Sequence, residues 1–149
     1  MKVTLGTNNF FLKNTFQNNL EEQKIRFIIQ KLKLRERQVI AHEMAHKAVG
    51  GRYTGAVHYN YTRGPDGKYY ITGGEVSIDV SEESHPEDTI RKMQIVRAAA
   101  LAPVDPSPQD LQVAQTATIK EIKARQELYR LQEEMKEKVS KERLFLAIA

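Results

Sequence analysis

The sequence has no cysteine and no tryptophan among its 149 residues. Without cysteine the chain can form neither disulfides nor thiolate metal ligands, so any metal site must use nitrogen and oxygen donors. Aromatic residues make up only 7% of the chain, and the 40% that are hydrophobic suffice for one small core. No apolar run approaches the length of a membrane-spanning helix or a signal peptide. We therefore expect a cytoplasmic protein with no membrane partner.

Charge is unevenly distributed along the chain, whose formal net charge is +4. Residues 1–68 hold twelve Lys and Arg against five Asp and Glu, whereas residues 69–149 hold eleven against fourteen. A basic half can favour a nucleic acid as partner. Between residues 24 and 37, however, the basic side chains have the spacing of a solvated helix face, so nucleic-acid binding is the weaker interpretation.

A helical pattern of apolar residues begins near Asn19, and no glycine or proline occurs between Glu36 and Val49. Gly50 and Gly51 are expected to end the helix. The pattern fits one unbroken helix or two helices that meet near Leu34. Residues 1–17 show no settled period, which indicates an N-terminal arm that is either flexible or a short strand.

The middle of the chain is rich in β-prone residues. Segments 57–62 and 68–72 flank the sequence Gly64-Pro65-Asp66-Gly67, in which proline presets a turn and Gly67 can adopt positive φ. This pattern predicts a β-hairpin. After Gly73-Gly74, residues 75–80 alternate between polar and apolar, which predicts a further half-buried strand.

Two helices are expected in the C-terminal half. One starts at about Pro86 and extends to about Ala102, and the other, capped by Asp105 or Ser107, starts at about Pro108. The last helix becomes strongly charged, with one apolar stripe typical of a packing or coiled-coil seam, namely Leu128, Leu131, Met135 and Val139.

The pattern as a whole predicts an α+β fold. We expect a mainly helical protein with a short antiparallel hairpin or sheet and two C-terminal helices. We divide the chain into an arm (1–17), a central domain (18–125) and a charged helical extension (126–149).

The segment His42-Glu43-Met44-Ala45-His46 is an HExxH motif within the predicted first helix. Residues four apart share a helix face, so His42 and His46 can bind one zinc ion together. Glu43 is then placed to act as general base on a zinc-bound water. We expect one zinc ion per chain.

A catalytic zinc needs a third protein ligand. Glu75 is the preferred candidate, because it is an isolated carboxylate next to two glycines that allow close approach of the backbone. Asp79, on the same side of the strand, is an alternative ligand, or it could hold the outer nitrogen of a ligating histidine. His58 and His85 are weaker candidates.

Peptide hydrolysis also requires a donor to the developing oxyanion. Candidates by sequence proximity are Tyr59, Tyr61, Tyr69, Tyr70 and Arg97. Arg97 is otherwise an unusual charge within an apolar segment, whereas each tyrosine is also a normal strand-packing residue.

Three segments, in fixed order, closely resemble the bacterial SprA-related family: AHEMAHKAVGG, YNYTRGPDGKYYITGGEVSID and TIRKMQIVRAAALAPVDPSPQDLQVA. The resemblance covers about residues 35–125 and implies metalloprotease activity. It implies that His42 and His46 are zinc ligands and that Glu43 is catalytic. Glu75 lies in the GGEV segment, which favours it as third ligand.

We therefore expect a mainly helical mini-zincin with an HExxH active-site helix, in which residues 18–125 form the zincin-like metalloprotease domain. The main hypothesis is a gluzincin-like zinc metallopeptidase that hydrolyses a peptide or protein substrate. The alternative is a metal-stabilised or catalytically inactive binding or scaffold module that docks through its charged helices.

Overall fold

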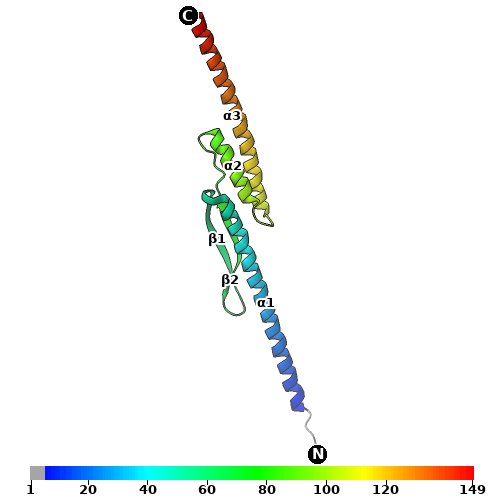
Figure 1. The fold of residues 1–149 in the computed structure, drawn as a ribbon. Coiled ribbons are helices and arrows are strands. Elements are labelled where there is room, and N and C mark those ends of the chain that lie inside the picture. Colours follow the sequence, from blue (N-terminus) through cyan, green and yellow to red (C-terminus); the bar gives the residue numbers. More distant parts are fainter. Residues whose placement is uncertain (1–5) are drawn as a thin grey trace, which may run out of the picture. The chain divides into compact units, whose positions relative to one another are not determined.

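The computed structural model describes residues 6–149, and within them the order of elements is helical, then β, then helical (Figure 1). The elements are α1 (Gly6–Gly50), the 3-10 helix η1 (Gly51–Tyr53), β1 (Thr54–Arg63), β2 (Tyr69–Ile78), α2 (Pro86–Ala100) and α3 (Pro108–Ile148). β1 and β2 form a two-stranded antiparallel sheet. The predicted mainly helical α+β class is confirmed.

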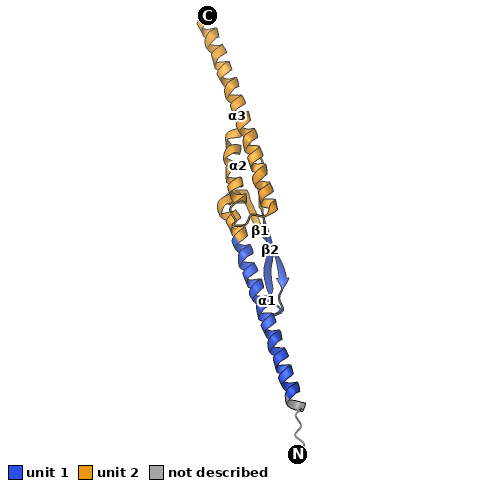
Figure 2. Cartoon of the chain, turned by 90° about the vertical axis from the view of Figure 1, so that its right-hand side faces the viewer, with its two compact units in different colours: residues 1–41, 58–75 blue, residues 42–57, 76–149 orange. Residues whose placement is uncertain are grey.

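The chain divides into two compact units (Figure 2). Unit 1 contains the described residues up to Ala41 together with His58–Glu75, and unit 2 contains His42–Val57 and Val76–Ala149. No helix within residues 6–149 has the length and apolar character needed to span a membrane. The functional division at residues 17 and 125 stays a prediction.

Unit 1 pairs a stretch of α1 with the tip of the hairpin. α1 continues through Leu34 without a break, and it includes residues 6–17, where we expected a flexible arm or a short strand. Residues 1–5 of that arm lie outside the described part. The backbone N–H of Ile71 donates to the Glu36 carboxylate at 2.8 Å, which ties the hairpin to the helix.

The hairpin turn forms where the sequence predicted it. Gly67 has a φ of 78°, a conformation that favours glycine, and the Gly64 N–H donates to the Lys68 carbonyl at 2.7 Å. The tyrosine hydroxyl of Tyr70 donates to Asp66 at 2.5 Å. These bonds close the turn without help from residues outside the hairpin.

The expected interruption of the strand at Gly73-Gly74 is wrong. β2 runs through both glycines to Ile78, so the two predicted strands are one. Among the described residues only Gly51 and Gly67 adopt positive φ, and Gly73 and Gly74 therefore keep a backbone that continues the strand.

Unit 2 is built on the packing of α2 against α3, which lie side by side in both ribbon views (Figures 1 and 2). Met93, Val96 and Ala117 are fully buried between these helices, and the partly buried side chains around them are Tyr53, Ile78, Val80 and Val113. The helix starts agree with the prediction: Pro86 opens α2, and Ser107 caps α3.

Two charged side chains are buried in unit 2. The Lys92 ammonium donates to Asp79 at 2.8 Å and to the Ser81 hydroxyl at 2.9 Å, and it pairs with Glu83. On the α2–α3 contact, Glu121 accepts hydrogen bonds from three side chains, namely Gln94, Arg97 and Arg125. Both buried charges are therefore paired, as burial requires.

Candidate metal centre

Two histidine rings meet on the last turns of α1, inside unit 2. Because His42 and His46 are four residues apart, they share one helix face, and their Nε2 atoms lie 3.2 Å apart. The rings meet edge to face at an interplanar angle of 77°. His46 is 1% exposed, whereas His42 is half-buried. The His46 ring therefore lies in the interior, whereas the His42 ring is partly accessible to solvent.

The first turn of α3 brings a carboxylate to the same point. Asp110 Oδ2 lies 3.2 Å from His42 Nε2, and Asp110 Oδ1 lies 3.3 Å from His46 Nε2. Within residues 6–149, these three residues form the group of His, Asp and Glu side chains with the spacing of a metal site. The sequence analysis did not identify Asp110 as a candidate ligand.

The tautomer of His46 follows from its second contact. His46 Nδ1 lies 2.9 Å from the Ala99 carbonyl oxygen, near the end of α2. A carbonyl can only accept, so Nδ1 carries the proton and donates it, and the lone pair of Nε2 points toward His42 and Asp110. Such an outer contact is the usual way in which proteins orient a metal-binding histidine.

The Asp110 carboxylate is oriented by the helix that carries it. The Ser107 N–H donates to Asp110 Oδ2 at 2.8 Å, and the Asp110 N–H donates to the Ser107 hydroxyl at 3.1 Å. This is a reciprocal capping box at the start of α3. Asp110 therefore does two things: it caps α3, and it presents its oxygens to the two histidines.

The donor set fits zinc. Histidine nitrogens and carboxylate oxygens bind zinc at about 2.0–2.2 Å, which places two tetrahedral ligands about 3.3–3.6 Å apart. The three contacts among His42, His46 and Asp110 are 3.2–3.3 Å, close to the lower end of that range. If these three donors held a zinc ion, they would leave room for a water or a substrate atom as a further ligand.

Glu43 is 4% exposed and follows His42 directly on α1. Like the three donors it belongs to unit 2, so the complete HExxH motif lies within one compact unit. The role of Glu43 as general base stays a prediction.

The other predicted site residues are not part of this group. Glu75 and His58 are exposed residues of unit 1, so their roles as ligands stay predictions, while the geometry favours Asp110. Asp79 accepts from the Lys92 ammonium and from the Ser81 N–H, and His85 is an exposed residue that precedes α2.

Apart from the half-buried Tyr59, the predicted oxyanion donors have other partners or are exposed. Arg97 donates to Glu121 at 2.5 Å within unit 2. All four tyrosines belong to unit 1, where the Tyr70 hydroxyl donates to Asp66, and Tyr61 and Tyr69 are more than half exposed. Their assignment as oxyanion donors stays untested.

One signal in the sequence could have identified Asp110. The segment Ser107-Pro108-Gln109-Asp110 has the spacing of a capping box, which predicts that the aspartate lies in the first turn of a helix. That interpretation accounts for the residue by itself, and it gives no reason to expect a second role. Only the packing of α3 brings the aspartate to the two histidines.

Comparison with known proteins gives one relationship. No curated protein and no solved structure matches the chain. The model of the SprA-related family matches residues 12–145, a longer stretch than the motifs alone covered. The match spans most of α1 and α3 as well as everything between them, and on this evidence the chain belongs to the SprA-related family.

Proposed function

We propose that this protein is a zinc-dependent metallopeptidase whose zinc ligands are His42, His46 and Asp110. The observation that carries the proposal is the convergence of these donors at 3.2–3.3 Å, the separation of ligands around one zinc ion. An aspartate as third ligand would depart from the glutamate expected for a gluzincin.

Each residue has a defined task in this proposal. His42, His46 and Asp110 would hold a zinc ion, which would polarise the substrate carbonyl and lower the pKa of a bound water toward about 7. Glu43 accepts the proton of the attacking water and then delivers it to the departing amine. The Ala99 carbonyl keeps the Nε2 lone pair of His46 directed at the site.

Zinc content and hydrolysis together test the proposal. We expect about one zinc per wild-type chain, loss of zinc in His46→Ala, and full zinc with no hydrolysis in Glu43→Gln. Elemental analysis measures the metal, and a library of fluorogenic peptides together with unfolded protein measures cleavage. A wild-type chain that takes up no zinc when the metal is supplied would exclude this function.

The scaffold alternative rests on a different observation, the exposed end of α3. In that case zinc binds as above, but wild-type protein and Glu43→Gln are equally inactive on every substrate. Zinc that is bound by four protein donors, measured by X-ray absorption spectroscopy, would favour this alternative because catalysis needs an open position.

A further inference from the structure

One row of residues on the last turns of α1 extends from the candidate metal centre to the end of α2. His42, His46 and Gly50 follow one another at intervals of four residues, so they lie on the same face of the helix. The first two carry the rings that meet Asp110. The third residue, Gly50, is buried and has no side chain. The whole row belongs to unit 2.

The backbone at position 50 does not require glycine. Gly50 has a φ of −78° and a ψ of −24°, which are helical angles that residues with a side chain also adopt. In a helix, alanine is even more favourable than glycine. The next residue, Gly51, differs in both respects: its φ is 51°, and a methyl group there would have no neighbour within 4 Å. Any need for glycine at position 50 must therefore come from the space around it.

The space around Gly50 has no room for a side chain. A methyl group on Gly50 would overlap the methyl group of Thr54, and it would lie 3.1 Å from the Cβ atom of Ala99. Two carbon atoms pack without strain at about 3.5–4.0 Å. Ala99 is fully buried near the end of α2, so relieving this contact requires the end of α2 to move away from α1.

Ala99, which packs against Gly50, is also the residue whose carbonyl oxygen lies 2.9 Å from His46 Nδ1. In a longer helix this carbonyl would accept a hydrogen bond from the backbone N–H four residues further on. That residue is Pro103, which has no N–H. The carbonyl accepts from the Ala102 N–H at 3.3 Å, and its second lone pair is free to accept from the imidazole. The negative end of the α2 dipole favours such a donor.

From this arrangement we infer that Gly50 is a positioning residue of the metal centre, because its missing side chain lets the end of α2 come close enough to fix the tautomer of His46. A side chain at position 50 would move α2 outward and lengthen the hydrogen bond from His46 Nδ1 to the Ala99 carbonyl. The imidazole would then lose the contact that keeps its proton on Nδ1 and its Nε2 lone pair directed at the metal. This role rests on the metal centre of the proposed function, but not on peptidase activity.

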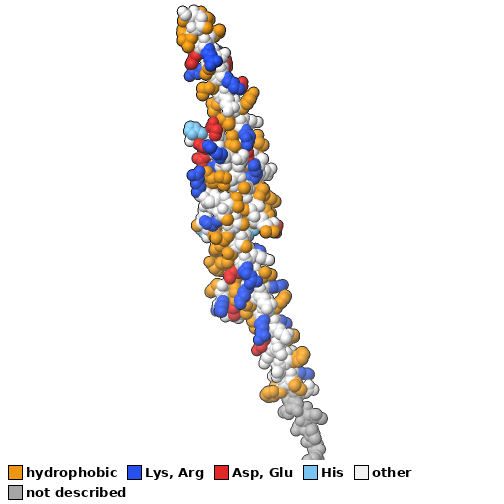
Figure 3. Space-filling model, viewed as in Figure 1, with side chains coloured by type: hydrophobic (Ala, Val, Ile, Leu, Met, Phe, Trp, Pro, Cys, Tyr) orange, Lys and Arg blue, Asp and Glu red, His pale blue; other side chains and the backbone are white. Residues whose placement is uncertain are grey.

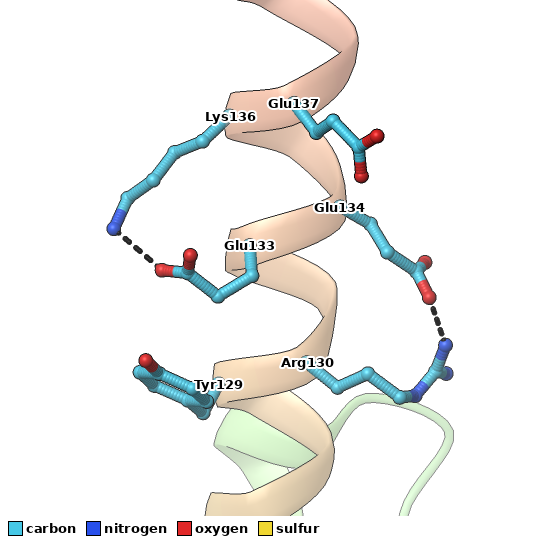
Figure 4. Close-up of a pocket in the computed structure, with 6 residues that line it drawn as sticks. All are labelled: Tyr129, Arg130, Glu133, Glu134, Lys136 and Glu137. Atoms are coloured by element: carbon cyan, nitrogen blue, oxygen red, sulfur yellow. Dashed lines mark hydrogen bonds and ion pairs between the residues drawn. The ribbon is translucent and has the colours of Figure 1, made fainter.

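The exposed end of α3 places no such limit on the size of a side chain. From Tyr129 onward every residue of α3 is exposed, and hydrophobic and charged side chains are mixed on this end of the chain (Figure 3). The hollow drawn in Figure 4 is lined by residues of α3 alone, including Lys136, which pairs with Glu133. Lys136→Ala is therefore a control for a helix substitution that leaves the metal centre untouched.

The tautomer of His46 in the zinc-free chain tests this role of Gly50. Long-range proton–nitrogen NMR in alkaline buffer, where histidine rings are neutral, distinguishes a ring protonated at Nδ1 from one protonated at Nε2. Thr54→Ser is the reference chain, because it removes the overlapping methyl group and keeps the hydroxyl that donates to the Gly51 carbonyl. In this chain, Gly50→Ala should change His46 from the Nδ1–H tautomer toward a mixture of both, and Gly50→Val should do so further.

Zinc affinity should change together with the tautomer. Loss of an outer contact of a metal ligand typically costs about 10–100-fold in affinity, so we expect about 10-fold for Gly50→Ala and more for Gly50→Val. Competition with a chromophoric chelator measures both. Adding Ala99→Gly to Gly50→Ala should restore the tautomer and most of the affinity, because it removes the methyl group against which the new side chain presses.

Gly51→Asn is the matched control, because asparagine tolerates positive φ and its side chain would lie in open space. Gly51→Asn and Lys136→Ala should both keep the tautomer and the zinc affinity of the wild type, and circular dichroism checks that each variant is folded. An unchanged His46 tautomer in both Gly50 variants, an equal change in Gly51→Asn, or no recovery with Ala99→Gly would each exclude this role of Gly50. A wild-type chain that binds no zinc would exclude the proposed function as well, whereas the three outcomes above leave that function in place.

Discussion

The two units of the chain differ in what they bury. Among the described residues, the buried polar and charged side chains all belong to unit 2, and they are Glu43, His46, Thr89, Lys92 and Glu121. Unit 1 buries the apolar Val39, the glycine Gly64 and the tyrosine Tyr70, and its charged side chains lie on or near the surface.

The difference shows how a small protein uses its interior. Burying a charge costs free energy unless it has partners, so a buried charged side chain needs neighbouring side chains in defined positions. Unit 2 provides those partners: Lys92 has three side-chain oxygens and Glu121 has two arginines. The candidate metal site lies in unit 2, where hydrogen bonds and ion pairs hold the buried polar side chains in place. Unit 1 consists of one helix and a hairpin, and it buries no charged side chain among its described residues.

The largest expected effect separates the two carboxylates proposed as third ligand. Asp110→Ala in unit 2 should lower zinc affinity by more than about 100-fold, since losing an outer contact alone costs about 10–100-fold. Glu75→Ala in unit 1 should leave affinity unchanged. Competition with a chromophoric chelator measures both constants, and the reverse order would return the third-ligand role to Glu75.

A smaller effect, on stability, is expected from replacing the buried Lys92 of unit 2. Lys92 is 1% exposed, and Lys92→Met leaves Asp79 and Glu83 without their cation, so we expect a loss of about 1–3 kcal/mol in unfolding free energy. Arg35→Met in unit 1 removes an exposed bond to the Thr72 carbonyl and should cost less than about 0.5 kcal/mol. Urea unfolding followed by circular dichroism measures the unfolding free energy of both variants. Equal losses in the two variants would contradict the expected difference between the two units.

The helix cap that orients Asp110 should have an effect of about 1 kcal/mol on stability. Ser107→Ala removes the hydroxyl that accepts from the Asp110 N–H, and such a loss costs typically about 1 kcal/mol. Because the same box holds the carboxylate, zinc affinity should also fall, and Ser107→Thr should restore both. Thermal unfolding and chelator competition are the two measurements. An unchanged zinc affinity in Ser107→Ala would show that the cap does not orient the ligand.

The smallest effect is a dependence of stability on pH. A hydrogen bond from Lys92 lowers the pKa of Asp79 below its usual range. Because the folded pKa is depressed, this stabilisation is present above the unfolded pKa of about 3.9 and is lost as pH falls through the folded value.

The pKa of Lys92 shifts in the opposite direction. Burial lowers it, but hydrogen bonds to Asp79 and Glu83 outweigh burial and raise it. Stabilisation by the raised pKa is present below about 10.4 and is lost as pH rises through the folded value. Urea midpoints should therefore be highest between these limits, and Lys92→Met should flatten both slopes. A profile that Lys92→Met leaves unchanged would contradict this account.

The sequence predicted the features that depend on local chemistry. The end of α1 at Gly50, the turn with Gly67 at positive φ, and the caps of α2 and α3 each follow from a few adjacent residues. The prediction that the strand ends at Gly73 was wrong, because glycine permits a break in a strand without requiring one. Whether the strand continues depends on its pairing with the neighbouring strand.

The composition of the metal group was beyond local reasoning. His42 and His46 could be paired from their spacing alone, whereas Asp110 is 68 residues from His42 and meets it only because α3 returns to the end of α1. Glu75 was chosen for its glycine neighbours, a local property. The sequence around Asp110 gives no comparable sign of a metal ligand, because the role of this aspartate as a helix cap already accounts for its presence.

His46 and Asp110 are far apart in the sequence, so a metal ion bound to both would also act as a cross-link between two distant parts of the chain. A zinc ion bound there would close a loop of 65 residues, from position 46 to position 110. By the chain-entropy relation used for disulfides, closing such a loop takes about 4 kcal/mol of freedom from the unfolded chain. In a chain without cysteine, one ion would thus serve where other small proteins use a covalent bridge. Removal of zinc would then lower the stability of the folded chain.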